Sequence, residues 1–318
     1  MMNTFRLYAT RITLLSILAG FSSICHAQLH WRPSAKHNDS LPASIRVYET
    51  TDSLDGHPFR AYYLKASALD KSISFDSRTG NGKRYTPAEY AAMETGKVYA
   101  VVNTTFFSFA DNSSLNMVVS KGKTIAHNLV IDTIKTFDGR PEIIYPTQGV
   151  FGILPDGRPD IAWVYPAGKN KEAYAYDAPN APQNGVWTKP TTKSGKRWKV
   201  VEAAGGAPVL LPYVSSVPEN RFAWHELDKH PRTAIGYTAD NEVIILAVEG
   251  RHAGVADGAT LLQLARIMRE LGCVEALNLD GGGSTTLWAG GQATIQPSDK
   301  KGPRPVPAVL LIKARDNN

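Results

Sequence analysis

The chain has 318 residues, of which 43% are hydrophobic and 20% are charged, and its formal net charge is +6. This apolar content is sufficient for a packed core and excludes an intrinsically disordered protein. Two cysteines exclude a disulfide-stapled mini-domain and a four-cysteine zinc site. Nor does any window reach the roughly 18 consecutive apolar residues that a membrane-spanning helix requires.

Residues 1–27 have the pattern of a secretory signal. Arg6 and Arg11 precede an apolar run over residues 12–21, and small residues then lead to a cleavage point between Ala27 and Gln28. The alternative is a buried N-terminal helix. We therefore expect an exported protein, periplasmic or secreted from a bacterial cell.

After this signal the sequence predicts a tether and one domain. Residues 28–44 are polar and contain two prolines, which is typical of a tether, and residues 45–318 are predicted to form the single domain. The domain keeps one thiol, Cys273, which lies in an apolar stretch and is expected in the core.

The domain begins with predicted strands and one helix. Residues 45–48 and 59–64 have β-patterns and flank a turn at Asp55-Gly56. Thr86-Pro87-Ala88-Glu89 combines an N-cap, a proline at the first helical position and a capping-box glutamate, which predicts a helix from Pro87 to about residue 95. A buried strand over residues 98–102 then runs into Asn103.

The middle of the chain, residues 115–200, alternates apolar runs with turn sequences, which indicates short strands. Residues 166–199 are predicted to form a long surface excursion. Its basic cluster would either attract an anionic polymer or form a solvated face. The members of this cluster are Lys189, Lys193, Lys196, Arg197 and Lys199.

The last third predicts a βαβ unit. An apolar strand over residues 242–248 is followed by a helix from Thr260 to Leu271 and by a strand over residues 274–279 that reaches Asp280. The strands of such a unit are parallel, so their C-terminal ends share one edge, where open sheets usually bind ligands. The predicted fold class is α/β to α+β, with a mixed β-sheet core, few helices and this one βαβ unit.

The run from Asp280 to Thr286 is the clearest local indication of a functional site in the sequence. Asp280 leaves a buried strand, and Gly281, Gly282 and Gly283 allow close backbone approach before the hydroxyl of Ser284. Successive amides in such a loop can bind an anion. No lysine follows the glycines, which excludes a Walker loop, and Ser284 lacks the frame of a nucleophile elbow. The alternative is a turn that only reverses the chain.

Other charged and aromatic residues are predicted near this loop. Glu249 and Arg251 follow the 242–248 strand, and Arg232 begins another strand. Arginine forks suit phosphate, although a structural ion pair is the alternative for each of them. Asn103 and Phe106 end a third buried strand and indicate either a sugar-binding platform or an edge strand with core phenylalanines.

The sequence predicts neither a metal site nor a cofactor. His225 and His230 are five residues apart in a loop, and none of the histidine spacings matches a zinc motif. We expect no nucleic-acid partner.

Several motifs together resemble the phosphodiester glycosidase family, whose members release a sugar from a sugar 1-phosphodiester. The resemblance rests on residues 249–251, on residues 258–272 and on residues 276–285, which include Asn278. It extends over about residues 200–312 and, more weakly, from about residue 60. Residues 103–107 stand where the family has Asn-Gly-Gly-Phe-Phe, so Thr104 and Thr105 replace two glycines.

The resemblance implies roles for the candidate residues. Asp280 would be the carboxylate that acts at the anomeric centre or on water, with Glu249 as the second candidate. A phosphate ester is a good leaving group, so one carboxylate and a phosphate clamp can suffice. Arg232 and Arg251 would form that clamp, assisted by the glycine amides, Asn278 and Ser284. Asn103 and Phe106 would line the sugar pocket.

The implied substrate is a carbohydrate phosphodiester, such as an envelope or extracellular glycan. Two other functions remain open at this point. One is a sugar-polymer binding module of the cell envelope without turnover. The other is a phosphodiesterase that cuts P–O, for which a two-metal cluster would be expected.

Overall fold

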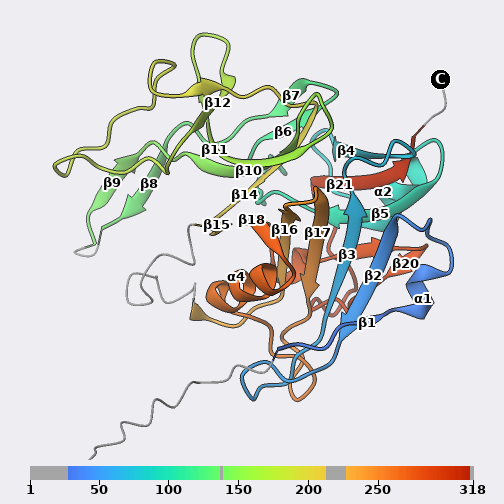
Figure 1. Cartoon of the computed structure of the whole chain (residues 1–318). Helices are drawn as coiled ribbons and strands as arrows, with labels where there is room; N and C mark the ends of the chain where they lie inside the picture. Colours follow the sequence, from blue (N-terminus) through green and yellow to red (C-terminus); the bar gives the residue numbers. More distant parts are fainter. Residues whose placement is uncertain (1–27, 137–138, 213–226, 316–318) are drawn as a thin grey trace, which may run out of the picture.

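The structure, a computed structural model, describes residues 28–136, 139–212 and 227–315 (Figure 1). The predicted secretory signal and His225 lie outside these residues. Within them, no helix has both the length and the apolar character needed to cross a bilayer. The described chain folds mainly into two seven-stranded sheets and one five-stranded sheet.

The first sheet has the strand order β1-β2-β3-β17-β16-β18-β15, and each neighbouring pair is antiparallel. The two strands expected around residues 45–48 and 59–64 are Ile45–Thr50 and Ala61–Ser67, which pair antiparallel, and Asp55 and Gly56 adopt positive φ at the turn between them. The strands of this sheet are β1 (Arg32–Pro33), β2 (Ile45–Thr50), β3 (Ala61–Ser67), β15 (Val209–Leu211), β16 (Arg232–Thr238), β17 (Glu242–Val248) and β18 (Cys273–Asn278).

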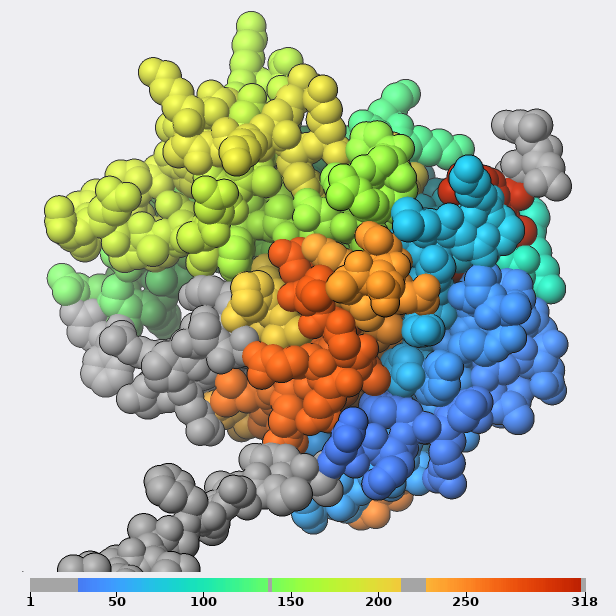
Figure 2. Space-filling model, in the orientation of Figure 1, coloured from blue at the N-terminus to red at the C-terminus, as the bar shows by residue number. Residues whose placement is uncertain are grey.

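The second sheet contains most of the middle of the chain, in the order β13-β12-β11-β10-β14-β6-β7. A small hairpin of β8 (Asp132–Lys135) and β9 (Pro141–Ile144) precedes β10. The strands of the second sheet are β6 (Val118–Ser120), β7 (Lys123–Ala126), β10 (Gln148–Ile153), β11 (Pro159–Ala167), β12 (Glu172–Tyr176), β13 (Lys196–Arg197) and β14 (Glu202–Gly206). Residues 150–200, yellow-green in Figure 2, gather at the top of the molecule, away from α4.

The third sheet has the order β20-β19-β5-β21-β4. Its β5 lies between β19 and β21, so the predicted strand before Asn103 is an interior strand, not an edge strand. Its strands are β4 (Ile73–Thr79), β5 (Val98–Asn103), β19 (Leu287–Ala289), β20 (Gln292–Ala293) and β21 (Ala308–Ala314).

The helices are few and short: α1 (Ala35–Asn38), α2 (Pro87–Met93), α4 (Leu261–Glu270) and the single-turn η3 (Gly282–Ser284). Thr86 and Glu89 form the predicted capping box of α2, and Thr260 and Gln263 form a second one at α4. α4 packs on β15, β16 and β18, where its buried side chains share a core with Leu246.

The strand–helix–strand unit near the C-terminus is confirmed, but a further strand lies between its two strands. β17 and β18 run in the same direction, but β16 lies between them and is antiparallel to both. Alternate residues of β17 enter the cores on opposite faces of the sheet: Ile245 packs in one core and Ile244 in the other. This explains the continuous apolar run, because both faces of the strand are covered.

Residues 28–44, predicted as a tether, are packed against the first sheet. β1 pairs with β2, and the His37 side chain is 1% exposed. Trp31 packs on Tyr63 with ring centroids 4.8 Å apart. The polar composition of residues 28–44 did not indicate these contacts. A few apolar side chains are enough to anchor so short a segment.

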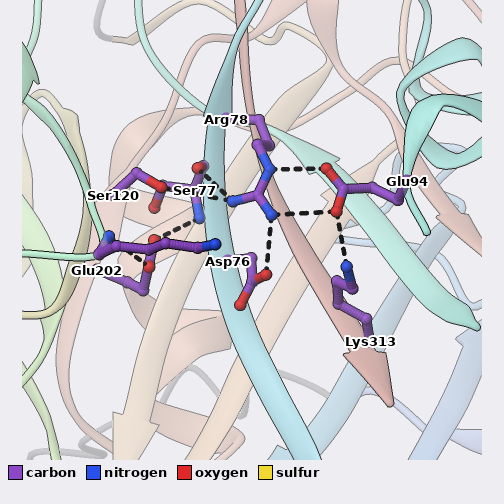
Figure 3. A network of polar contacts seen from close by, with 8 residues as sticks. Asp76, Ser77, Arg78, Glu94, Ser120, Glu202 and Lys313 are labelled. Carbon is purple, nitrogen blue, oxygen red and sulfur yellow. Dashed lines mark hydrogen bonds and ion pairs between the residues drawn. The ribbon is translucent and has the colours of Figure 1, made fainter. Parts of the chain in front are cut away.

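A buried polar network connects the third sheet to the second (Figure 3). The Arg78 guanidinium donates to Glu94 Oε1 at 2.6 Å, and Lys313 Nζ donates to Glu94 Oε2 at 2.7 Å. Across the sheets, Glu202 accepts from the Ser77 amide at 2.7 Å and from the Lys121 amide at 2.8 Å. Burial raises the pKa of Glu202 to about 7, although both amides oppose this increase.

Replacing Glu94 with Gln tests how much this network stabilises the fold. We expect the free energy of unfolding to fall by about 2–3 kcal/mol, between the ~0.2–1 kcal/mol of exposed ion pairs and the ~3–5 kcal/mol lost when a fully buried pair is broken. Urea unfolding measures it. The control is Arg158→Ala, since the Arg158 and Asp156 side chains are 60% and 51% exposed. Equal losses in both variants would contradict a stabilising role for the buried network.

Candidate functional site

The predicted site residues come together where three strands of the first sheet meet. β17 ends before Glu249, β18 ends before Asp280, and β16 begins at Arg232 between them. Because β16 is antiparallel to both neighbours, its start lies at the edge where they end. The ends of β17 and β18 therefore do share one edge, as the sequence predicted.

Both backbone polar groups of Asp280 form hydrogen bonds with residues at the end of β5. Its amide donates to Thr104 O at 2.8 Å, and its carbonyl accepts from Asn103 Nδ2 at 2.6 Å. Asn103 Oδ1 accepts from Thr233 Oγ1 and from the Thr286 amide, each at 2.9 Å. Asn103 is 0% exposed, so its side chain positions Asp280 instead of facing solvent.

The Asp280 carboxyl is perturbed by its surroundings. Burial raises its pKa to about 6, while the Gly281 amide, which donates to Oδ1 at 2.9 Å, and the positive charge of Arg304 oppose the increase. The Ser284 hydroxyl faces the carboxyl and also opposes it, although it makes no hydrogen bond of regular geometry. A carboxyl of this kind exchanges its proton close to neutral pH, which suits a general base or a nucleophile.

The three glycines after Asp280 are used mainly for close packing. A methyl group on Gly281 would lie 2.8 Å from Pro231 O, and one on Gly283 would overlap the Arg304 guanidinium and the Asp299 carboxylate. The Gly282 amide donates to Pro231 O at 2.8 Å. Since the Gly281 amide is also engaged, Gly283 is the one glycine of the loop whose amide has no acceptor among the described residues. The anion-binding nest predicted here is therefore much reduced.

Two guanidinium groups lie over this glycine loop. A methyl group on Gly282 would lie 3.2 Å from Arg251 Nη2, and Arg304 covers Gly283. Arg251 is exposed and holds φ at +64°, an uncommon conformation for its residue type. Arg304 forms a two-point ion pair with Asp299, with Nε 2.9 Å from Oδ2. Arg304 therefore supplies the positive charge that acts on the Asp280 carboxyl, and Arg251 lies over the adjacent Gly282.

Arg232 lies next to the glycine loop, as predicted, and a methyl group on Gly281 would lie 3.8 Å from its Cα. Its Nε donates to Ala259 O and its Nη2 donates to Asp228 O, each at 3.0 Å. These bonds connect the start of β16 to the loops on either side. The phosphate-binding role that the sequence suggests for Arg232 stays a prediction.

Glu249, the second candidate carboxylate, is 2% exposed. Its Oε1 accepts from the Gln296 amide at 2.9 Å, and its Oε2 lies 3.7 Å from Arg60 Nη1. Burial raises its pKa, which the Gln296 amide and Arg60 oppose. Asp280 is more accessible than Glu249 and is therefore the better candidate to meet a substrate.

Several buried polar atoms around the loop have no hydrogen-bond partner among the described residues: Thr104 Oγ1, Thr105 Oγ1, Asn278 Oδ1, Ser284 Oγ and Thr285 Oγ1. Buried polar groups are normally paired, so an enclosed water molecule would satisfy these atoms. Asn278 Nδ2 is engaged with Ala207 O at 2.6 Å. Phe106 is partly buried, and its amide donates to Asn116 Oδ1 at 2.9 Å.

The two threonines that replace glycines are accommodated without strain. Neither Thr104 nor Thr105 has a positive φ, so this segment does not need glycine for its backbone conformation. Arg304 begins a C-terminal segment, residues 304–309, that also resembles the family, but the sequence indicates no site role for it. Its role depends on a contact with Gly283 that only the folded chain shows.

In the part of the chain that the structure describes, histidine, cysteine and acidic side chains do not gather in threes as metal ligands would. Cys273 is buried, and burial raises the pKa of its thiol to about 12. It is an inert core residue.

The sequence model of the family named phosphodiester glycosidase matches residues 96–313. Over 77 residues the chain is 36% identical to the SPbeta prophage-derived uncharacterized protein YomE of Bacillus subtilis (strain 168). Over 87 residues it is 32% identical to N-acetylglucosamine-1-phosphodiester alpha-N-acetylglucosaminidase of Mus musculus. The two alignments cover 24% and 26% of this chain but 12% and 16% of the relatives, so the chain spans only a small part of their length.

Among solved structures, the catalytic domain of the zebrafish N-acetylglucosamine-1-phosphodiester alpha-N-acetylglucosaminidase has the same fold. The TM-score is 0.55 at 21% sequence identity, and the match covers 92% of each chain.

Proposed function

Because the chain belongs to the phosphodiester glycosidase family, we propose that it is a hydrolase that cleaves a sugar 1-phosphodiester at the glycosidic C1–O bond. The products are the free sugar and a phosphomonoester. The observation that carries this proposal is the placement of Asp280: a partly buried residue whose carboxyl pKa burial raises to about 6, with Arg304 acting on it and Arg251 over the adjacent Gly282.

The chemistry follows from this arrangement. Water supplies the oxygen that bonds to the anomeric carbon, the C1–O bond breaks, and its electron pair leaves with the phosphate. Ionised Asp280 either takes the proton of the attacking water or first bonds to the anomeric carbon and is then displaced by water. Arg251 and Arg304 stabilise the charge that develops on the departing phosphate. Asn103 and Glu249 hold the loops that carry these groups.

The sugar would occupy the space next to Asp280. A pyranose at this position would lie against the partly exposed residues Asp280, Gly281 and Gly282, because Ser284, Thr104 and Thr105 are at most 2% exposed. Phe106, partly buried beside them in sequence, would contribute an apolar face. We propose an N-acetylglucosamine 1-phosphodiester or a related sugar ester as the substrate class, which membership of the phosphodiester glycosidase family supports.

We predict that the protein hydrolyses UDP-N-acetylglucosamine and that ¹⁸O from labelled water enters the sugar. The variant Asp280→Asn should lower kcat by at least ~100-fold, because a positioned acid–base group contributes about 10²–10⁴-fold. The control Asp156→Asn, at an acid 51% exposed in a surface turn, should keep full activity. Mass spectrometry of the products measures both.

The other outcomes decide between functions. Label in the phosphate would identify a phosphodiesterase that cuts P–O. Binding of the sugar ester without products would identify a binding module. Undiminished turnover by the Asp280→Asn variant would exclude Asp280 as the acting carboxylate.

The pH profile tests the ionisation state that the proposal requires. Because the pKa of Asp280 is about 6 and the ionised form reacts, kcat/KM should rise with pH to about 6 and level off near 7. Below pH 6 it should fall about tenfold per pH unit. Arg304→Gln removes a charge that holds this pKa down, so it should move the profile to higher pH. A profile that falls with rising pH over this range would contradict the role of an ionised Asp280.

We also propose that the protein is exported, which its family alone does not decide. The basic flank, apolar run and small residues of residues 1–27 support export. N-terminal sequencing of protein recovered from the periplasm or medium should begin at Gln28. Recovery of the intact chain from the cytoplasm alone would contradict this proposal.

A further inference from the structure

The edge of the third sheet beside Asp280 carries a group of aromatic and basic residues. Arg84 follows β4, Phe107 and Phe109 follow β5, and Arg304 precedes β21. Because β21 is antiparallel to both β4 and β5, its start lies at the edge where they end. Three separate segments of the chain therefore meet at this place.

The contacts in this group are specific. The guanidinium carbon of Arg84 lies 5.5 Å from the Phe107 ring centroid and 5.4 Å from that of Phe109. The guanidinium carbon of Arg304 lies 5.7 Å from the Phe109 centroid. The two rings are 4.7 Å apart. We refer to Arg84, Phe109 and Arg304 as the arginine–phenylalanine cluster.

Two features of the cluster are unusual for a structural contact. Phe109 is 66% exposed, although burial of a large aromatic ring is favourable. Arg84 contacts the two rings, and no carboxylate among the described residues pairs with it. A guanidinium held on an aromatic face keeps its N–H edge available, so it can bind an anion bidentately.

The cluster is continuous with the catalytic site. Arg304 covers Gly283 and acts electrostatically on Asp280, so it belongs to both. Arg84 contacts the same Phe109 ring as Arg304, and this ring connects it to the site. A phosphate held at Arg251 and Arg304 would thus have the Arg84 guanidinium as a further cationic group in its neighbourhood.

We propose that the cluster is a subsite for a second phosphate in the leaving group, so that the preferred substrates are sugar 1-diphosphate esters. The proposal rests on the proposed function. The phosphate next to the sugar lies at Arg251 and Arg304, and the following phosphate binds the N–H edge of Arg84. Arg84 and Arg304 both lie against the Phe109 ring, so this ring brings the two guanidinium groups into one neighbourhood. A neutral sugar would gain little binding energy from stacking on Phe109, because the guanidinium groups of Arg84 and Arg304 already lie over that ring.

The test compares two substrates that share the sugar and differ in charge: UDP-N-acetylglucosamine and the methyl phosphodiester of N-acetylglucosamine 1-phosphate. We expect the wild-type kcat/KM to favour the diphosphate. Arg84→Gln should reduce this preference about tenfold, which corresponds to about 1.4 kcal/mol, mainly through KM for the diphosphate. Hydrolysis of the methyl ester should stay within about twofold. Arg84→Lys, which keeps the charge without the fork, should restore part of the preference.

The matched control is Lys83→Gln, which makes the same charge change in the same loop. Lys83 is exposed, so its replacement should leave both substrates unaffected. Isothermal titration with inorganic pyrophosphate tests the subsite without turnover, and Arg84→Gln should weaken this binding about tenfold.

Two results would overturn the proposal. One is an equal loss of kcat/KM for both substrates in the Arg84→Gln variant, and the other is an unchanged substrate preference together with unchanged pyrophosphate binding. Failure of the wild type to hydrolyse either ester while Arg84 still governs pyrophosphate binding would overturn the glycosidase function instead.

Discussion

The arrangement around Asp280 depends on the close approach of one backbone segment, at Pro231, to two glycine-bearing loops. A methyl group on Gly250 would lie 2.7 Å from Pro231 N, and one on Gly281 would lie 2.8 Å from Pro231 O. The Gly282 amide bonds to the same carbonyl at 2.8 Å. Three loops from three strands therefore pack backbone against backbone. Any side chain at these glycines would separate the loops and move Asp280 away from the arginines, which is why the glycines matter more for packing than for binding anions.

This packing also sets the electrostatics of the site. Desolvation raises the pKa of Asp280 to about 6, while the Gly281 amide and Arg304 limit the increase. The balance leaves a carboxyl that is ionised at neutral pH yet still basic enough to accept a proton. Arg251 and Arg304 would face the phosphate of a substrate. One local arrangement would thus supply both the base and the stabilisation of the leaving group. The arginine–phenylalanine cluster extends this positive charge along the edge of the neighbouring sheet.

Local sequence signals predicted the local structure well. The Thr86 capping box, the Asp55-Gly56 turn and the β17–α4–β18 unit were all foreseeable, because each depends on residues close together in the chain. The long-range arrangement was not. Nothing in the sequence near β17 or β18 indicates that β16 lies between them, and Asn103 looks like a sugar ligand until Asp280 and Thr233 are seen to use its amide. The roles of Arg304 and Arg84 could not be predicted for the same reason, because they depend on contacts with Gly283 and Phe109 that form only in the folded chain.

The central claim is that Asp280 acts at the anomeric carbon of a sugar phosphodiester. A crystal structure of the Asp280→Asn variant with an uncleaved N-acetylglucosamine 1-phosphodiester tests it most directly. Our account predicts that the anomeric carbon faces the substituted side chain and that the adjacent phosphate contacts Arg251 and Arg304. A ligand whose phosphorus atom faces residue 280, or one bound only at the basic surface formed by residues 166–199, would contradict it.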